Sequence, residues 1–564
     1  MKLEEIADRV IETDVLIMGG GIGGCCAAAK AAEHGLKVVL AEKANPERSG
    51  SAAMGIDHYG GFPKGTSVLN MVNKAQKFIS MTNGPGRFLD PNLNYKIYDS
   101  AFWALEELEK LGVSSKWDDG EYRWMPEPEN SMRGGGTLRV HWQNIKPQLA
   151  KTVKERGVEI LQWTPIIDFL TNEDKIVGAT ALNSRTGEFI VIKAKAVVVA
   201  TGSFGRCYEG ETPLPGKYKF KYHFCPASLS GDGHAAVYRA GGELVNMELT
   251  GFGFKIRDDL TISYGNLPLN EGIPMKVFTW NGQEILNPNT EQYAELEKKG
   301  LTPIYESIEN LSDDWHKRIE VCYTDERLVS FKIAEDRGFN PKTHRYELMA
   351  LKPYQFSLSS GVCLINDEFQ TSIKGLYATG DCTAGATGCS GSIPSGLYIG
   401  DNIYKFVNTV GKISINIEQV MAHKELAMSP LDIQNGIEPM ELECSVRHIC
   451  ERYVGINKSE GKLREGLRRL NSLKREFLPK LMAKTPHYLT RCLEIRNIMD
   501  LAEVHIYACL ERKETRGGFF RADYPQIDPL RTNMATYQRM ENGKSILEIR
   551  EVPDLKQENI EKGC

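Results

Sequence analysis

The strongest constraint on the fold of this chain is a glycine-rich turn between an apolar, strand-like run and a helix. Gly19, Gly21 and Gly24 follow the apolar run with GxGxxG spacing, and a second apolar run after the helix ends at Glu42. In a dinucleotide site, glycines let the backbone approach the pyrophosphate, the helix N-terminus faces its charge, and the later acid binds ribose hydroxyls. The first sixty residues therefore predict a nucleotide site. The alternative is a glycine turn that serves only strand–helix packing.

Size and composition predict a multidomain globular protein. The chain has 564 residues, which is too many for one ordinary hydrophobic core, so two to four domains are expected. A hydrophobic content of 41% is typical of globular proteins, and a net charge of −5 argues against general binding to nucleic acid or anionic membranes. No apolar run approaches the roughly 20 residues that span a bilayer. Because the N-terminus is too acidic for a secretory or transit peptide, we expect a cytoplasmic protein without a direct membrane span.

The 13 cysteines are scattered without a CxxC pair or a disulfide-like rhythm. Structural zinc ions and iron–sulfur clusters are normally held by clustered thiolates. The sequence therefore predicts no metal site in this chain. Free and mostly buried thiols are expected instead, and they suit a reducing compartment.

Two later segments extend the nucleotide site into a two-part domain. A buried strand-like run leads into the Ala-Thr-Gly triplet at residues 200–202, as in the interior of a parallel sheet. Another strand-like run ends at Gly380 and Asp381, where the acid can meet a ribityl or phosphate hydroxyl. Either segment alone suits an ordinary buried strand. Their order after the glycine turn predicts a two-part FAD-binding domain.

The order of these segments predicts an α/β fold with a two-part Rossmann-like FAD-binding domain, an inserted α+β capping domain and a C-terminal helical domain. An insertion between the two cofactor-binding parts places the substrate cleft at the domain interface. Later apolar residues recur at helical spacing, and the basic residues among them suit a solvated face. The predicted bounds are 1–214 and 350–430 for the FAD-binding domain, 215–349 for the capping domain, 431–515 for the helical domain and 516–564 for a C-terminal extension.

Local patterns add a coarse assignment of secondary structure. They predict helices over residues 92–111 and about 144–155, strands over 159–161, 176–180 and 189–192, a hairpin-like strand over 545–549 and a polar tail without order.

With these motifs in view, the chain resembles the flavoprotein subunits of the fumarate reductase, succinate dehydrogenase and L-aspartate oxidase superfamily. Within that group it is most similar to the alpha subunit of dissimilatory adenylylsulfate reductase. The resemblance covers nearly the whole chain, and the segments that carry it are the N-terminal glycine turn and residues 48–53, 230–233, 375–381, 390–396 and 514–524. It implies bound FAD, a small-molecule substrate and a separate ferredoxin-like iron–sulfur subunit. An oligomer or heteromer is therefore expected.

The motifs and the resemblance together predict a set of FAD-binding residues. They are Gly19, Gly21, Gly23, Gly24, Glu42, Lys43, Ser49, Gly50, Ser51, Ala52, Ala200, Thr201, Gly202, Asp232, Gly380, Asp381, Ser392 and Ile393.

Three departures from the family pattern indicate a different substrate. Succinate dehydrogenases attach FAD through a histidine, but residues 48–50 contain none, so noncovalent FAD is expected. Residues 387–391 lack the histidine and arginine of fumarate reductases, which argues against a dicarboxylate reductase that uses that arginine. Residues 357–361 lack the histidine of adenylylsulfate reductases, and the arginine that binds their substrate aligns near Lys255. The chain is thus a divergent member.

The candidates for acid–base and charge-clamp roles follow the glycine-rich segments. His58 comes just after the ring-contacting segment and is a candidate proton relay, because histidine titrates near neutral pH; a structural or surface histidine is the alternative. Arg139 and His141 follow a glycine turn and are candidates for substrate contact.

The remaining candidates come from the cap and the later loops. Lys255, Arg257 and Tyr264 lie in the predicted cap, where solvent exposure is the alternative. By resemblance Arg516 binds an anionic substrate or orients the site, with a buried salt bridge as the alternative. For Cys389, a role in packing is expected rather than a role as a redox thiol.

The sequence therefore predicts an oxidoreductase subunit that transfers a hydride between noncovalent FAD and a small anionic substrate and exchanges electrons with an iron–sulfur partner. A noncatalytic flavin electron-transfer or assembly subunit is the alternative. An oxidase that passes electrons to oxygen, as L-aspartate oxidase can, is a third possibility. The identity of the substrate does not follow from the sequence.

Overall fold

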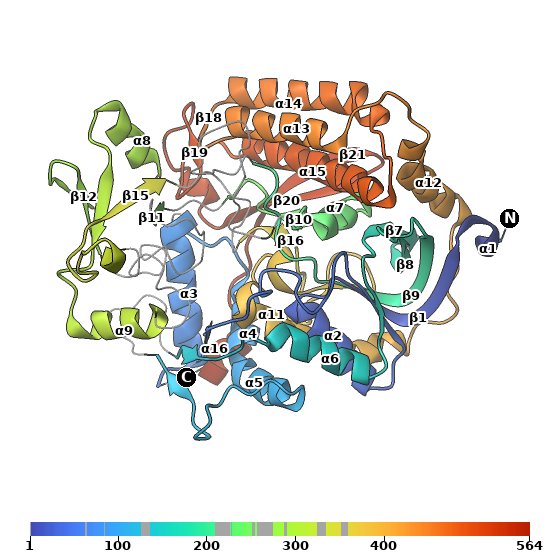
Figure 1. The fold of residues 1–564 in the computed structure, drawn as a ribbon, viewed down its shortest axis with the longest axis horizontal. Helices are drawn as coiled ribbons and strands as arrows, with labels where there is room; N and C mark the ends of the chain where they lie inside the picture. Colours follow the sequence, from blue (N-terminus) through green and yellow to red (C-terminus); the bar gives the residue numbers. More distant parts are fainter. Residues whose placement is uncertain are drawn as a thin grey trace.

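A seven-stranded sheet with parallel strands at its centre organises the molecule (Figure 1). The computed structural model describes residues 2–62, 65–83, 85–125, 136–208, 226, 228–250, 254–256, 275–286, 290–323, 334–350 and 359–563. The strands follow the order β6 (Glu159–Leu161), β2 (Val38–Ala41), β1 (Arg9–Met18), β9 (Phe189–Val199), β8 (Lys175–Leu182) and β7 (Ile166–Asn172), with β17 (Leu376–Ala378) also paired to β9. The last four residues of β1 are all buried, as expected for a strand covered on both faces.

The two parts of the predicted nucleotide-binding domain meet on β9. Strand β1 pairs in parallel with β9 as far as Met18↔Val199, and β17 pairs in parallel with the same end of β9, from Leu376↔Val197 to Ala378↔Val199. One strand from before the insertion and one from after it therefore flank β9. This arrangement confirms the predicted fold class.

Helices α2 (Ile22–Glu33) and α11 (Gly388–Val407) pack closely because glycines line their contact. A Cβ atom on Gly396 would lie 2.3 Å from the carbonyl oxygen of Gly23, and one on Gly400 would lie 2.4 Å from that of Ala27. The close approach holds the first two turns of α2 against the middle of α11. Helix α6 (Ile145–Glu155) packs on α2, and helices α4 (Pro91–Asp99) and α5 (Ala101–Lys110) pack on α11.

A second, five-stranded antiparallel sheet lies apart from the first, almost entirely within the residues predicted as the capping domain (Figure 1). Its order is β11 (Phe254–Ile256), β15 (Tyr346–Ala350), β14 (Ile304–Ser307), β12 (Lys276–Thr279) and β13 (Glu284–Ile285), and helices α8 (Thr290–Lys298) and α9 (Asp313–Tyr323) accompany it. It has its own apolar core around Val277, Ile304 and Leu348. In Figure 1, helix α3 (Val68–Asn83) runs between this sheet and α4, which it contacts.

The C-terminal part combines a helical layer with a hairpin. Helices α13 (Pro439–Tyr453), α14 (Glu460–Glu476) and α15 (Pro486–Glu511) pack on one another, as predicted for a helical domain, and α12 (Ile417–Met428) packs on α15 and β7. Hairpin strands β20 (Met534–Glu541) and β21 (Lys544–Glu551) join β10 (Leu244–Val245) and β16 (Gly361–Val362) in a four-stranded sheet. Residues 228–250, including helix α7 (Asp232–Arg239), therefore pack with the main body and precede the cap sheet.

Smaller elements complete the chain. Strands β3 (His58–Tyr59), β5 (Leu138–Arg139) and β4 (Arg123–Trp124) form one small sheet, β18 (Asn457–Lys458) pairs with β19 (Phe520–Arg521), and α1 (Leu3–Ile6) precedes β1. The tail predicted to lack order forms α16 (Gln557–Gly563), which packs on α3 and whose buried Asn559 donates a hydrogen bond to Asn92. Within the described ranges, no helix has the length and apolar character needed to cross a bilayer.

Candidate active site

The three glycines of the GxGxxG turn have different structural tasks. Gly19 has a φ of +106°, and a Cβ atom there would lie 2.5 Å from the carbonyl oxygen of Ala200. A Cβ atom on Gly24 would lie 2.0 Å from the carbonyl oxygen of Gly19, so the first turn of α2 rests directly on the glycine turn. Gly21 caps α2, lines the cavity and leaves ordinary room for a Cβ atom, 3.6 Å from Ala200. The backbone at Gly21 is therefore the part of the turn that a phosphate group in the cavity can approach.

Glu42 ends β2 with its carboxylate held by two backbone amides. The amide of Gly20 donates to Oε2 at 2.6 Å, and the amide of Ala44 donates to Oε1 at 2.8 Å. These bonds fix the carboxylate at the cavity, where its remaining lone pairs can accept the ribose hydroxyl bonds predicted from the sequence.

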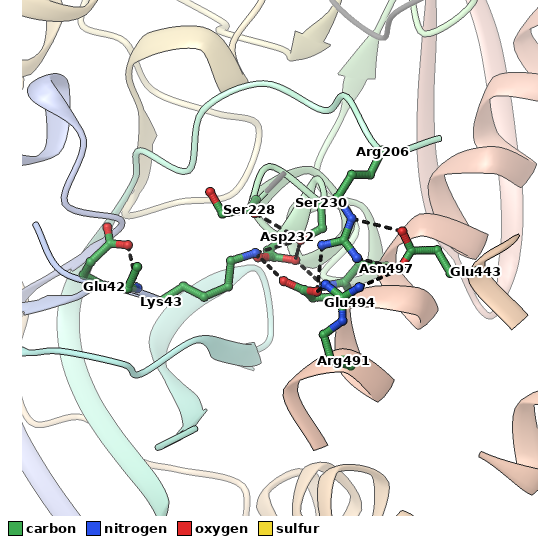
Figure 2. Close-up of polar contacts among 11 residues, drawn as sticks. Glu42, Lys43, Arg206, Ser228, Ser230, Asp232, Glu443, Arg491, Glu494 and Asn497 are labelled. Atoms are coloured by element: carbon green, nitrogen blue, oxygen red, sulfur yellow. Dashed lines mark hydrogen bonds and ion pairs between the residues drawn. The ribbon is translucent and has the colours of Figure 1, made fainter. Parts of the chain in front are cut away.

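Lys43, which lines the cavity, bonds residues on α7 and α15, and Figure 2 shows these contacts. Its Nζ donates to Ser230 Oγ at 2.8 Å, to Asp232 Oδ2 at 2.7 Å and to Glu494 Oε1 at 2.9 Å. Asp232 also accepts from Asn497 at 2.8 Å. Lys43 and Asp232 line the cavity and hold each other there.

A buried ion network extends from Glu494 into the helical layer (Figure 2). Arg206, which is 2% exposed, donates to Glu494 at 2.7 Å and makes two bonds to Glu443 at 3.1 and 2.6 Å. Arg491 donates to Glu494 at 2.7 Å. Burial raises the pKa of Glu494, but Lys43, Arg206 and Arg491 together lower this pKa to about 2.

One cavity of about 730 Å³ joins these segments. Of the predicted FAD-binding residues, it is lined by Gly19, Gly21, Gly23, Glu42, Lys43, Ser49, Gly50, Ser51, Ala52, Ala200, Thr201, Gly202, Asp232, Gly380, Asp381 and Ser392. Gly24 and Ile393 lie behind the lining, in the packing of α2 and α11. The hydroxyls of Ser49 and Thr201 are buried without a partner among the residues described, and they line the cavity. Unpaired hydroxyls, a glycine-lined wall and a helix N-terminus fit FAD.

The histidine on β3, His58, also lines the cavity and forms a hydrogen bond with its neighbour Asp57. His58 lines the cavity with a side chain 21% exposed, and its Nδ1 lies 2.7 Å from Oδ1 of buried Asp57. Arg139, opposite His58 on β5, lies behind the dyad and pairs with the Asp57 carboxylate at 3.1 Å. This pairing leaves Nε2 of His58 as the ring nitrogen available to the cavity.

Two of the other candidates, His141 and Arg516, lie away from the cavity lining. His141 is exposed and packs edge-on against Trp117. Arg516 is buried, donates to the carbonyls of Pro85, Thr532 and Arg531, and pairs with Glu514 at 3.0 Å. Lys255 lies on β11, in register with Met349. Arg257 and Tyr264 lie outside the described residues.

Cys389 lines the cavity, where its Sγ lies 3.4 Å from the carbonyl oxygen of His58. Burial raises the pKa of this thiol to about 12, so the thiolate form is disfavoured, in line with a packed cysteine. Across the described part of the chain, no three His, Cys, Asp or Glu side chains are placed to hold a metal ion.

Sequence reasoning missed one wall of the cavity. Met71, Lys74 and Ala75 of α3 and Asn94 and Tyr98 of α4 line it, together with neighbouring apolar side chains. The i, i+3, i+4 spacing within α3 is a signal of a common helix face, but such spacing usually indicates packing against a core.

Comparisons with known proteins agree with this geometry. The FAD binding domain family matches residues 14–255, and the family described as fumarate reductase flavoprotein C-term matches residues 444–559. The chain is similar to an uncharacterised FAD-dependent oxidoreductase of Methanocaldococcus jannaschii (24% identity, covering 92% of this chain and 94% of the relative). It is also similar to one subunit of the fumarate reductase (CoM/CoB) of Methanothermobacter marburgensis (22% identity, covering 92% and 96%). The solved structure of adenylylsulfate reductase from Archaeoglobus fulgidus shares the fold, with a TM-score of 0.79 at 24% identity, and the match covers 99% of this chain and 98% of that one.

The fold and the cavity thus define an FAD-dependent oxidoreductase. Both family matches and the full-length relatives place it more narrowly. The chain belongs to the fumarate reductase/succinate dehydrogenase flavoprotein superfamily.

Proposed function

We propose that the protein is an oxidoreductase subunit that transfers a hydride between noncovalent FAD and a small anionic substrate and exchanges electrons with an iron–sulfur partner. Bound FAD supplies the hydride chemistry. The observation that carries the proposal is the chain Arg139–Asp57–His58, whose exposed end faces the cavity. Asp57 accepts a hydrogen bond from the Nδ1–H group of His58 and orients the ring, and Nε2 of His58 takes up or releases the substrate proton.

His58→Gln is expected to slow flavin reduction by substrate about 100-fold, because general acid–base groups contribute at least this much. Asp57→Asn should slow it about tenfold and change its pH profile, because the ring loses its fixed tautomer. The measurement is stopped-flow bleaching of the flavin under anaerobic conditions with a panel of small anionic donors. His141→Gln is the matched control, since His141 lies outside the cavity lining and should leave the rate unchanged. A wild-type rate in His58→Gln would contradict the assignment.

The same bleaching assay separates the proposal from its alternatives. Bleaching by one small molecule supports direct oxidation of a substrate. Bleaching only through a partner protein supports a noncatalytic electron-transfer role, and rapid reoxidation with formation of peroxide supports an oxidase. The proposal of an iron–sulfur partner would be contradicted if the natively purified protein showed neither iron–sulfur absorbance nor a second polypeptide.

Noncovalent FAD has a direct test. Acid precipitation of the holoprotein should leave all of the flavin in the supernatant, because residues 48–50 offer no histidine for attachment. If flavin remains in the precipitate and still migrates with the polypeptide in denaturing electrophoresis, the expectation of noncovalent FAD is contradicted.

A further inference from the structure

The cavity wall formed by α3 and α4 belongs to none of the nucleotide-binding motifs. Lys74 projects from the middle of α3, and Asn94 and Tyr98 come from successive turns of α4. The two helices contact each other directly. These side chains share the cavity with His58 and Gly61, which lie on the loop around β3.

Lys74 differs from the other lysines of the cavity. Lys43 makes three polar contacts, with Ser230, Asp232 and Glu494, and Lys146 donates to the carbonyl of Gly20. Lys74 is half-buried, and it has no hydrogen bond or ion pair with any residue that the structure describes. An ammonium group in this position favours an anionic ligand, because none of the described carboxylates that line the cavity forms an ion pair with it.

Asn94 and Tyr98 add neutral donors beside the lysine. Asn94 is 7% exposed, and its Oδ1 accepts a hydrogen bond from Gln76 at 3.0 Å, which leaves its amide N–H groups for the cavity. Burial raises the pKa of Tyr98 to about 12, so its phenol keeps the proton and can donate. A Cβ atom on Gly61 would lie 2.9 Å from the Tyr98 ring, so the ring is seated against the loop that follows His58.

The surroundings of these donors are apolar. Met71 and Ala75 flank Lys74 on the same face of α3, and Leu89 and Ile97 lie on the wall beside Asn94 and Tyr98. Three donors that line one cavity next to hydrocarbon suit a ligand with a charged oxyanion at one end and an apolar body.

We propose that Lys74, Asn94 and Tyr98 form the subsite that binds the oxyanion headgroup, carboxylate or sulfonate, of an organic acid substrate, with its hydrocarbon part against Met71, Leu89 and Ile97. The proposal rests on the proposed function, in which His58 handles the proton at the same cavity. It makes Lys74 the residue that determines specificity for anions.

The test is a titration of FAD-loaded protein with straight-chain carboxylates and alkanesulfonates of two to six carbons, followed by perturbation of the flavin absorbance. Wild-type protein should bind at least one acid of the series with saturation. Lys74→Met should weaken this binding about tenfold or more, and Tyr98→Phe should weaken it severalfold. Tighter binding of the carboxylates or of the sulfonates identifies which headgroup the subsite prefers.

Lys77→Met is the matched control, because Lys77 lies on the same helix and is exposed. It should leave acid binding unchanged, and both lysine variants should keep the wild-type affinity for FAD. Equal weakening in both variants would overturn the subsite, as would a loss of FAD affinity in Lys74→Met without a change in acid binding. Wild-type protein that binds none of the acids would overturn it as well. If Lys74→Met binds acids normally while His58→Gln still loses flavin reduction, the subsite fails and the proposed function stands.

Discussion

Replacing Gly24 with alanine is expected to destabilise the protein by about 3 kcal/mol, whether or not FAD is bound. The added Cβ atom would lie 2.0 Å from the carbonyl oxygen of Gly19, a backbone atom of the turn itself, and 3.1 Å from the Cβ atom of Ala200. Gly19 directly follows β1 and Ala200 directly follows β9, so neither atom can move without shifting the end of a central strand. Thermal and urea unfolding of the apoprotein, followed by circular dichroism, measures the loss.

Gly21→Ala is the matched control, three positions earlier in the same turn. Its Cβ atom would make only an ordinary contact, 3.6 Å from the carbonyl oxygen of Ala200, so apoprotein stability should fall by less than about 1 kcal/mol. Because Gly21 lines the cavity, the same variant should bind FAD at least about tenfold more weakly. Wild-type stability in Gly24→Ala, or wild-type FAD affinity in Gly21→Ala, would contradict this division of tasks.

Glu494→Gln is expected to cost about 3–5 kcal/mol at neutral pH, because it removes one carboxylate from a buried network and leaves its cations in place. Glu494 bonds Lys43, Arg206 and Arg491, and all three stay buried or half-buried after the change. Lys43 also lines the cavity, so FAD affinity should fall with stability. Urea unfolding and FAD titration of the variant measure both effects.

The dependence on pH has a defined sign. The pKa of Glu494 in the folded protein is about 2, below its ordinary value of 4.5. Its ion pairs therefore stabilise the fold fully above about pH 5, and this contribution of about 3 kcal/mol is lost as the pH falls from about 5 to 2. The stability difference between wild type and Glu494→Gln should shrink over this window.

Glu465→Gln provides the control for this pH dependence. The pKa of Glu465 is also lowered to about 2, by bonds from Arg468 and Arg469, but these partners are exposed on α14. Solvent and salt screen exposed ion pairs, so this variant should unfold as wild type does at every pH. A pH-independent difference for Glu494→Gln would contradict the buried network.

Local patterns predict much of the central fold. The apolar runs that form β1 and β9 are long and buried on both faces, so their type follows from the residues alone. Local patterns do not predict strand β7, because the charged residue Asp168 interrupts the apolar run of this strand. The structure explains this residue, since Asp168 accepts a hydrogen bond from Arg239 at 2.7 Å, and that arginine lies on α7.

For the candidate site too, the sequence predicts some of the residues, and only the structure shows their contacts. The position of Lys43 after Glu42 predicts contact with FAD, but its bonds to Asp232 and Glu494 involve residues far along the chain. Resemblance predicts Arg516 at the substrate, and the structure places it among backbone carbonyls instead. Its role at the substrate stays a prediction without a contact to the cavity among the described residues.

The sequence by itself determined the nucleotide-binding turn, because its requirements are local. The clash that excludes a side chain at Gly24 involves Gly19, five positions away, so the pattern of glycines records the constraint directly. The opposite end of the cavity was decided only by the tertiary structure. The sequence position of His58 made it a candidate, but Lys74 and Tyr98 come from two separate helices, and nothing in the sequence places them in the same cavity as this histidine. Their proximity depends on how those elements pack, which is a property of the folded chain as a whole.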